Sequence, residues 1–193
     1  MIEFQDISFS YPEGTEGGLK NINLTIPDGQ CVLFCGQSGC GKTTLTRLVN
    51  GLIPQFFDGK LTGKVLFNGE NLFNVPMYQI AEKVGSVFQN PRTQFFNVDT
   101  DSEIVFGLEN EAVPQEELKS SVMETAKSLH IESLLGRNIF ALSGGEKQKI
   151  AFASVYAMNP EVYLLDEPSS NLDMATIKEL REHLKLIKAQ GKT

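Results

Sequence analysis

The stretch CVLFCGQSGCGKTT, residues 31–44, decides the fold of this 193-residue chain. Four of its residues satisfy the pattern G-x-x-x-x-G-K-[ST], namely Gly36, Gly41, Lys42 and Thr43. The apolar run CVLFC ahead of the glycines predicts a strand buried on both faces of a parallel sheet. Behind the loop, leucine and valine recur at helical spacing over residues 45–52. Strand, glycine loop and helix, in that order, are the context that a phosphate-binding loop requires.

The loop residues have a clear chemical logic. Glycines allow backbone amides to point at phosphate oxygens, and the start of the following helix adds its dipole. We expect Lys42 to reach the terminal phosphates of a bound nucleotide and Thr43 to offer its hydroxyl to Mg²⁺. A glycine turn that happens to contain a lysine is disfavoured by the flanking elements. The expected phosphate-binding residues are Gly36, Gln37, Ser38, Gly39, Cys40, Gly41, Lys42, Thr43 and Thr44.

The stretch VYLLDEPSSNLD, residues 162–173, supplies the carboxylates that such a loop needs. An apolar strand that ends in Asp166 can present that carboxylate to Mg²⁺. Glu167 follows directly and is a candidate to accept a proton from, or to orient, the water that attacks the terminal phosphate. Many buried strands end in solvated acids, so this pattern gains its meaning from the phosphate loop upstream.

A second glycine-bearing stretch, ALSGGEKQKIAF, occupies residues 141–152. Ser143 and Glu146 have the spacing of a capping box and predict a helix start. Gly144 and Gly145 in the first turn each sacrifice about 1 kcal/mol of helix propensity. The cap alone indicates only a well-capped helix, whereas the glycine pair indicates an anion that approaches the backbone closely.

Composition limits the classes of function. The formal net charge of -7 disfavours a nucleic-acid partner. Three cysteines without a secretory leader indicate a reducing, cytoplasmic compartment, and we interpret Cys31, Cys35 and Cys40 as small buried hydrophobes rather than zinc ligands. No apolar run is long enough to span a bilayer, so any membrane connection is expected to run through a partner.

The remaining segments predict an α/β fold with three parts. Alternating apolar residues over 2–26, with an irregularity at Gln5 and Asp6, predict an N-terminal antiparallel β subdomain. Asn68 and Gly69 mark a hairpin turn. Helical periodicity over residues 101–135 predicts a helical insertion. The phosphate loop predicts a P-loop NTPase core with a mostly parallel sheet, to which the β subdomain and the helical insertion are attached.

LSGGEKQ ahead of LLDEP, with the phosphate loop far upstream, resembles the signature of ATP-binding-cassette (ABC) ATPases over essentially the whole chain. The resemblance implies a single nucleotide-binding domain over residues 1–193, with a helical subdomain at roughly residues 91–160. It implies a dimer with an identical or related cassette, in which Ser143, Gly144 and Gly145 meet the partner's ATP. It also implies three further roles. Gln89 would be the Q-loop glutamine that serves metal binding and catalysis, Asp173 the D-loop aspartate and Tyr11 the adenine-stacking tyrosine.

VFQNPRTQFF and DSEIVFGLENEAVPQEEL resemble the ATPase subunits of energy-coupling factor transporters. That resemblance implies uptake of a vitamin or transition-metal ion, an integral membrane partner and a peripheral location on the cytoplasmic face of the membrane. Phe95 and Phe96 are expected either to form a groove for the membrane subunit or to lie in the core. Neither the substrate nor the identity of the second cassette follows from the sequence.

One departure from the family pattern concerns the C-terminal end. Members continue into a strand with a switch histidine, and this chain ends at QGKT, with His130 and His183 both in predicted helices. We therefore expect a C-terminally truncated cassette that binds ATP and hydrolyses it poorly. A soluble ABC ATPase of DNA repair or translation is the alternative, disfavoured by the acidic balance. A small-molecule kinase or GTPase would need no second glycine pair.

Overall fold

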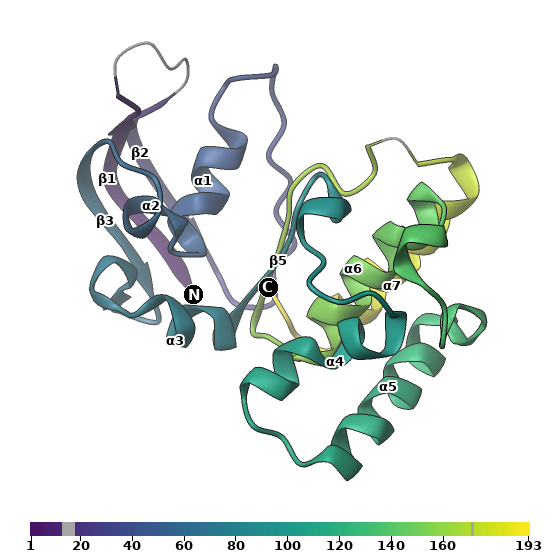
Figure 1. The fold of residues 1–193 in the computed structure, drawn as a ribbon. Helices are drawn as coiled ribbons and strands as arrows, with labels where there is room; N and C mark the ends of the chain where they lie inside the picture. Colours follow the sequence, from purple (N-terminus) through teal and green to yellow (C-terminus); the bar gives the residue numbers. More distant parts are fainter. Residues whose placement is uncertain (13–17, 171) are drawn as a thin grey trace. The chain divides into compact units, whose positions relative to one another are not determined.

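The computed structural model describes residues 1–12, 18–170 and 172–193. The chain forms two compact units (Figure 1). The first contains Met1–Val84, Glu161–Asp166 and Lys188–Thr193, and the second contains Gly85–Pro160 and Glu167–Ile187. Among the described residues, no helix is both long and apolar enough to cross a membrane.

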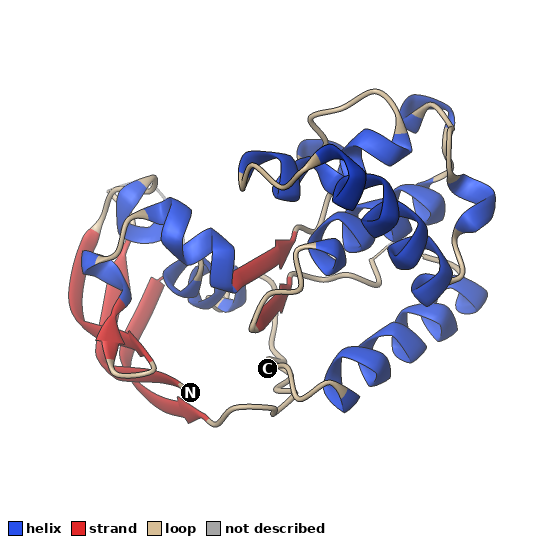
Figure 2. Ribbon diagram, turned by 90° about the horizontal axis from the view of Figure 1, so that it is seen from below, coloured by secondary structure: helices blue, strands red, loops and turns tan. Residues whose placement is uncertain are grey.

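The first unit contains an antiparallel sheet in the order β2-β1-β3-β4 (Figure 2). The strands are β1 (Ile2–Ser10), β2 (Gly18–Ile26), β3 (Lys60–Phe67) and β4 (Glu70–Asn71). The register of β1 shifts between Phe4 and Ile7, where Asp6 has φ 49°, so the predicted irregularity is confirmed. The turn at Asn68 and Gly69 is also confirmed, with φ 50° and 86°, the left-handed values that a two-residue hairpin demands.

Three short helices pack with this sheet around an apolar core. They are α1 (Lys42–Val49), α2 (Leu52–Gln55) and α3 (Met77–Lys83). The core takes Leu48 and Val49 from α1 and Phe4 from β1, all of them buried. The apolar spacing behind the phosphate loop therefore predicted the buried face of α1 correctly, and burial of that face fixes the helix that the loop leads into.

The prediction for residues 31–35 was wrong in two respects. This segment is not a strand, and Leu33 is 82% exposed. Cys31, Cys35 and Cys40 are exposed free thiols rather than buried hydrophobes. A strand exists only through hydrogen bonds to a neighbour, and no described strand pairs with this segment. Local apolarity cannot supply that neighbour.

The second unit is mainly helical. Its helices are α4 (Thr100–Asn110), α5 (Gln115–Leu129), α6 (Gly144–Ala157) and α7 (Met174–Ala189), the last of which continues two residues beyond the unit. Helix α4 packs against both α5 and α6. Ile104 of α4 and Ile150 of α6 are fully buried, so apolar burial holds the insertion together.

Two short strands complete the description: β6 (Val162–Leu165) belongs to the first unit, and β5 (Val84–Val87) leads from the first unit into the second. Within the first unit, the last residue of the chain lies beside the start of β6. Thr193 N donates to Glu161 O at 3.1 Å, and Tyr163 N donates to Thr193 O at 2.8 Å. These bonds hold β6 in the unit that also contains the phosphate loop.

A buried histidine makes the stability of the second unit sensitive to acid. His183 of α7 is only 8% exposed, stacks on Phe152 with ring centroids 5.3 Å apart, and has Nε2 3.1 Å from Leu129 O. Loss of hydration lowers the pKa of His183. The folded state therefore favours the neutral ring over the charged ring. The neutral ring contributes fully to the free energy of unfolding when the pH is above the pKa of the histidine in the unfolded chain, and this contribution is lost as the pH falls below that pKa.

We expect the free energy of unfolding to fall on acidification below about pH 6.5, with at most about 1.4 kcal/mol per pH unit from this one proton. In His183→Gln that part of the loss should disappear. Exposed His130, the smallest contributor to the lowered pKa of His183, provides the control His130→Asn, which should retain most of the wild-type pH dependence. Urea titrations at a series of pH values measure the effect, and an unchanged slope in His183→Gln would contradict it.

Candidate functional site

The phosphate loop folds back on itself ahead of α1. Gly39 and Gly41 have φ 78° and 101°, in the left-handed region that favours glycine. A Cβ on Gly41 would lie 2.7 Å from a methyl carbon of Leu19 and 3.0 Å from a backbone oxygen. Lys42 Nζ donates to the carbonyl oxygens of Gly36 and Gln37, both at 3.0 Å. The loop thus curls around its own lysine at the start of α1.

The structure brings together two of the predicted magnesium ligands. Thr43 Oγ1, in the first turn of α1, donates to Asp166 Oδ2 at 2.9 Å, across 123 positions of sequence. Asp166 directly follows β6, so the end of that strand sets the position of its carboxylate. A hydroxyl and a carboxylate oxygen are hard ligands of the kind that Mg²⁺ prefers, and the pair therefore fits that ion.

The second unit brings together Gln89 and Glu167. Gln89 Nε2 donates to Glu167 Oε2 at 2.7 Å. The backbone of Glu167 has φ 46°, a left-handed conformation that costs a residue with a side chain about 1 to 2 kcal/mol. Such strain is typical of positions where a side chain must be aimed in one direction. Nothing in the spacing of the sequence pointed to this pair.

Tyr11, the expected adenine-stacking residue, is tied to α1. Its hydroxyl lies 3.3 Å from Thr44 Oγ1 and accepts from Arg47 Nη1 at 2.9 Å. The ring meets Phe57 edge to face at 6.5 Å, and the Arg47 guanidinium lies 4.1 Å from the centroid of Phe57. Arg47 and Phe57 were not predicted as site residues. Arg47 lies three residues after Thr44 on the same helix, and that spacing could have indicated it.

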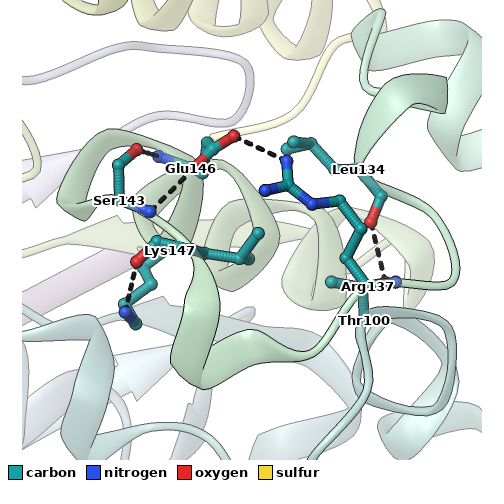
Figure 3. Close-up of polar contacts among 7 residues, drawn as sticks. Thr100, Leu134, Arg137, Ser143, Glu146 and Lys147 are labelled. Atoms are coloured by element: carbon teal, nitrogen blue, oxygen red, sulfur yellow. Dashed lines mark hydrogen bonds and ion pairs between the residues drawn. The ribbon is translucent and has the colours of Figure 1, made fainter.

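The signature stretch forms the predicted capping box (Figure 3). Ser143 N donates to Glu146 Oε2 at 2.7 Å, and Glu146 N donates to Ser143 Oγ at 3.3 Å. These bonds from Ser143, together with the ion pair to Arg137, lower the pKa of Glu146 to about 2. The carboxylate therefore remains charged at neutral pH.

The two glycines of the signature are not equivalent. Apart from the backbone of its own helix, a Cβ on Gly144 would meet none of the described atoms within 4 Å, so their packing does not require glycine there. A Cβ on Gly145 would lie 3.2 Å from Thr176 Oγ1 of α7. Packing therefore restricts a side chain more at position 145 than at position 144.

Two further predicted residues lie in the second unit. Asp173 Oδ1 accepts from Thr176 N at 2.7 Å at the start of α7, and this bond lowers the pKa of Asp173. Phe96 is 76% exposed and stacks on Phe106 with ring centroids 4.7 Å apart. Of the two interpretations of Phe95 and Phe96, the core placement fails for Phe96, whereas Phe95 is half-buried.

The family model described as "ABC transporter" matches residues 19–170, which is more than half of the chain. The chain belongs to the ABC transporter family. A putative ABC transporter ATP-binding protein of Treponema denticola is 60% identical over 193 residues, all of this chain and 40% of that protein. The chain therefore spans less than half the length of this ABC relative.

Two other ABC relatives have more specific descriptions. EcfA1 of Ligilactobacillus salivarius, an energy-coupling factor transporter ATP-binding protein, is 38% identical over 96% of this chain and 66% of EcfA1. The structure of CbiO1 from Clostridium perfringens, described as part of the ABC transporter complex cbiONQ, matches with a TM-score of 0.84. CbiO1 is 29% identical to this chain, and the match covers 98% of this chain and 74% of the CbiO1 chain. The predicted resemblance and fold class are confirmed.

Proposed function

We propose that this protein is the ATP-binding and ATP-hydrolysing subunit of a membrane transporter. The observation that carries the proposal is the bond between Thr43 and Asp166 beside the phosphate loop. In this proposal the loop amides and Lys42 bind the phosphates of ATP, and Thr43 and Asp166 hold Mg²⁺, with Gln89 contributing. Bound Mg²⁺ would neutralise the charge of the terminal phosphates.

Hydrolysis would depend on Glu167. Its carboxylate would take the proton of the attacking water, or orient that water, while Gln89 holds Oε2 by the bond at 2.7 Å. Lys42 and the loop amides would stabilise the charge that develops on the transferring phosphoryl group. Because this chemistry needs positioning more than covalent steps, small displacements of these groups should slow it strongly.

The second half of the site would come from another cassette. Gly144 leaves the start of α6 open to a close approach, which supports contact of Ser143, Gly144 and Gly145 with ATP held by a partner subunit. The partner would be an identical or a related ABC ATPase. We also propose that Tyr11 stacks on adenine and that Asp173 contributes to the same interface. Residues 1–193 would then act as one nucleotide-binding domain with a helical subdomain at roughly residues 91–160.

The transporter proposed is of the energy-coupling factor type and takes up a vitamin or a transition-metal ion. The likeness to EcfA1 and CbiO1 supports this class over a soluble ABC ATPase of DNA repair or translation. The exposed ring of Phe96 would contact an integral membrane subunit, and the protein would lie peripherally at the cytoplasmic face of the membrane.

Purification of the full-length protein from solubilised membranes tests this proposal. We expect an integral membrane subunit and a second ABC subunit to co-purify, and the complex to hydrolyse ATP in the presence of Mg²⁺. Phe96→Ser should reduce recovery of the membrane subunit without reducing ATP binding. Turnover that is stimulated by nucleic acid, without any membrane subunit, would favour the soluble alternative.

Cys40 offers a separate test of the phosphate loop. This exposed thiol lies 4.0 Å from Lys42 Nζ, and a Cβ on Gly36 would lie only 2.6 Å from its sulfur. We expect N-ethylmaleimide to weaken ATP binding by roughly tenfold or more, through bulk rather than lost chemistry. Cys31 and Cys35 should first be replaced by Ser, so that only Cys40 reacts.

The matched control is Cys40→Ala in the same background. This variant should bind ATP as the wild type does and should be indifferent to the reagent. Equilibrium binding of a fluorescent ATP analogue measures both proteins. Normal binding by protein alkylated at Cys40 would show that the thiol lies away from the nucleotide.

A further inference from the structure

Two segments of the second unit run side by side and connect the exposed Phe96 with the signature turn. Ile139 N donates to Val98 O at 2.8 Å, and Thr100 N donates to Arg137 O at 3.0 Å. An antiparallel β-bridge lies between these two bonds. The two segments therefore form a short ladder in which neither can move alone without loss of hydrogen bonds.

One end of this ladder is anchored by a buried carboxylate. Glu103 of α4 is only 2% exposed, and its Oε2 accepts from Phe96 N at 3.0 Å and from Asn97 N at 2.8 Å. Charged acceptors make strong hydrogen bonds to backbone amides, and loss of such a partner in the interior is costly. The backbone that bears the exposed Phe96 ring is thus fixed to α4.

Thr100 locks the middle of the ladder. Its buried hydroxyl donates to Leu134 O at 2.9 Å and accepts from Arg137 N at 3.2 Å. Together with the bond from Thr100 N, this arrangement holds Arg137 through both its backbone N–H and its carbonyl oxygen. The position of the Arg137 backbone is therefore set by the first residue of α4.

The other end reaches the signature through one side chain (Figure 3). Arg137 Nη1 donates to Glu146 Oε1 at 2.8 Å, while Oε2 of the same carboxylate accepts from Ser143 N at 2.7 Å. A hydrogen bond from a guanidinium to a carboxylate is strong and directional, so it sets the orientation of the Glu146 side chain. The carboxylate that closes the capping box is therefore oriented from outside α6.

We propose that Arg137 is a positioning residue that sets the signature turn, Ser143–Gly145, according to the position of the Phe96–Thr100 segment. The inference rests on the proposed function, in which that segment meets the membrane subunit and that turn meets the partner's ATP. A displacement of the segment reaches Ser143 through the Thr100–Arg137 bonds and the ion pair. The ion pair is partly exposed, with 42% and 29% of the two side chains accessible, so its role is orientation more than stability.

The test compares Arg137→Met with Arg181→Met in the full-length protein. Arg181 is exposed on α7, so its variant removes the same charge away from the signature. The measurement is dimerisation driven by the β,γ-imido analogue of ATP with Mg²⁺, followed by sedimentation. We expect Arg137→Met to weaken the dimer roughly threefold or more, whereas Arg181→Met leaves it unchanged.

Two additional readouts separate positioning from a merely structural role. Affinity of the monomer for the analogue and the melting temperature should both stay at their wild-type values in Arg137→Met. Arg137→Lys, which retains a cation, should recover at least part of the lost dimer affinity. Glu146→Gln removes the charge on the other side of the pair and should weaken the dimer as Arg137→Met does.

A wild-type dimer strength in Arg137→Met would overturn the inference, as would a parallel loss of monomer affinity and melting temperature. Absence of any recovery in Arg137→Lys would count against it in the same way. If Arg137→Met does not fold, the dimer strength of Glu146→Gln alone decides the outcome. A wild-type protein that does not dimerise with the analogue would instead refute the proposed function, and the inference about Arg137 would fall with it.

Discussion

Replacement of Glu167 with Gln should leave ATP binding nearly intact and lower the turnover of the full-length protein by between about 100-fold and 10,000-fold, the usual contribution of a general base. The amide is nearly isosteric and its oxygen can still accept from Gln89 Nε2. It cannot accept a proton from water. The backbone at φ 46° is unchanged by the substitution, so the local strain remains the same.

Steady-state ATP hydrolysis and equilibrium binding of ATP with Mg²⁺ measure the two quantities separately. Glu161→Gln is a suitable control because Glu161 is exposed at the opposite end of β6. The control should retain wild-type turnover. Retained turnover in Glu167→Gln would remove Glu167 from the role of base and leave it as a partner of Gln89 only.

Replacement of Lys42 with Ala should weaken ATP binding by about 10- to 100-fold, since a hydrogen bond from a charged donor is worth roughly 1.5 to 3 kcal/mol. Lys42 donates to two carbonyl oxygens of its own loop, so its loss also frees the loop from its compact form. Both effects act in the same direction. Turnover at saturating ATP should fall as well, because the ammonium group stabilises the transferring phosphoryl group.

The control for this prediction is Lys64→Ala, which removes an exposed lysine from β3. Isothermal titration of each variant with ATP and Mg²⁺ measures the affinity directly. An affinity of Lys42→Ala within twofold of the wild type would show that the lysine does not reach the phosphates.

Local features of the fold followed directly from sequence patterns. The capping box at Ser143, the hairpin turn at Asn68 and Gly69 and the apolar face of α1 all form as predicted. Each depends on residues within one or two helical turns or one hairpin. Interactions at such short range are encoded by spacing alone.

Features that depend on distant neighbours were less predictable. The apolar segment at residues 31–35 is not a strand, and its cysteines are exposed. Gly145 turned out to lie against Thr176, about thirty positions away in the sequence. In each case the deciding contact belongs to another part of the chain, and no periodicity in the segment itself reports it.

The sequence by itself determined the chemical groups of the site: the glycine loop with its lysine, two adjacent carboxylates after an apolar strand, and a glycine pair behind a serine cap. Only the tertiary structure decided which of these groups meet. Thr43 bonds Asp166 across 123 positions, and Arg137 bonds the carboxylate that closes the signature cap. The physical reason is that motif chemistry is local, whereas the distance between two motifs is set by the packing of the strands and helices that bear them.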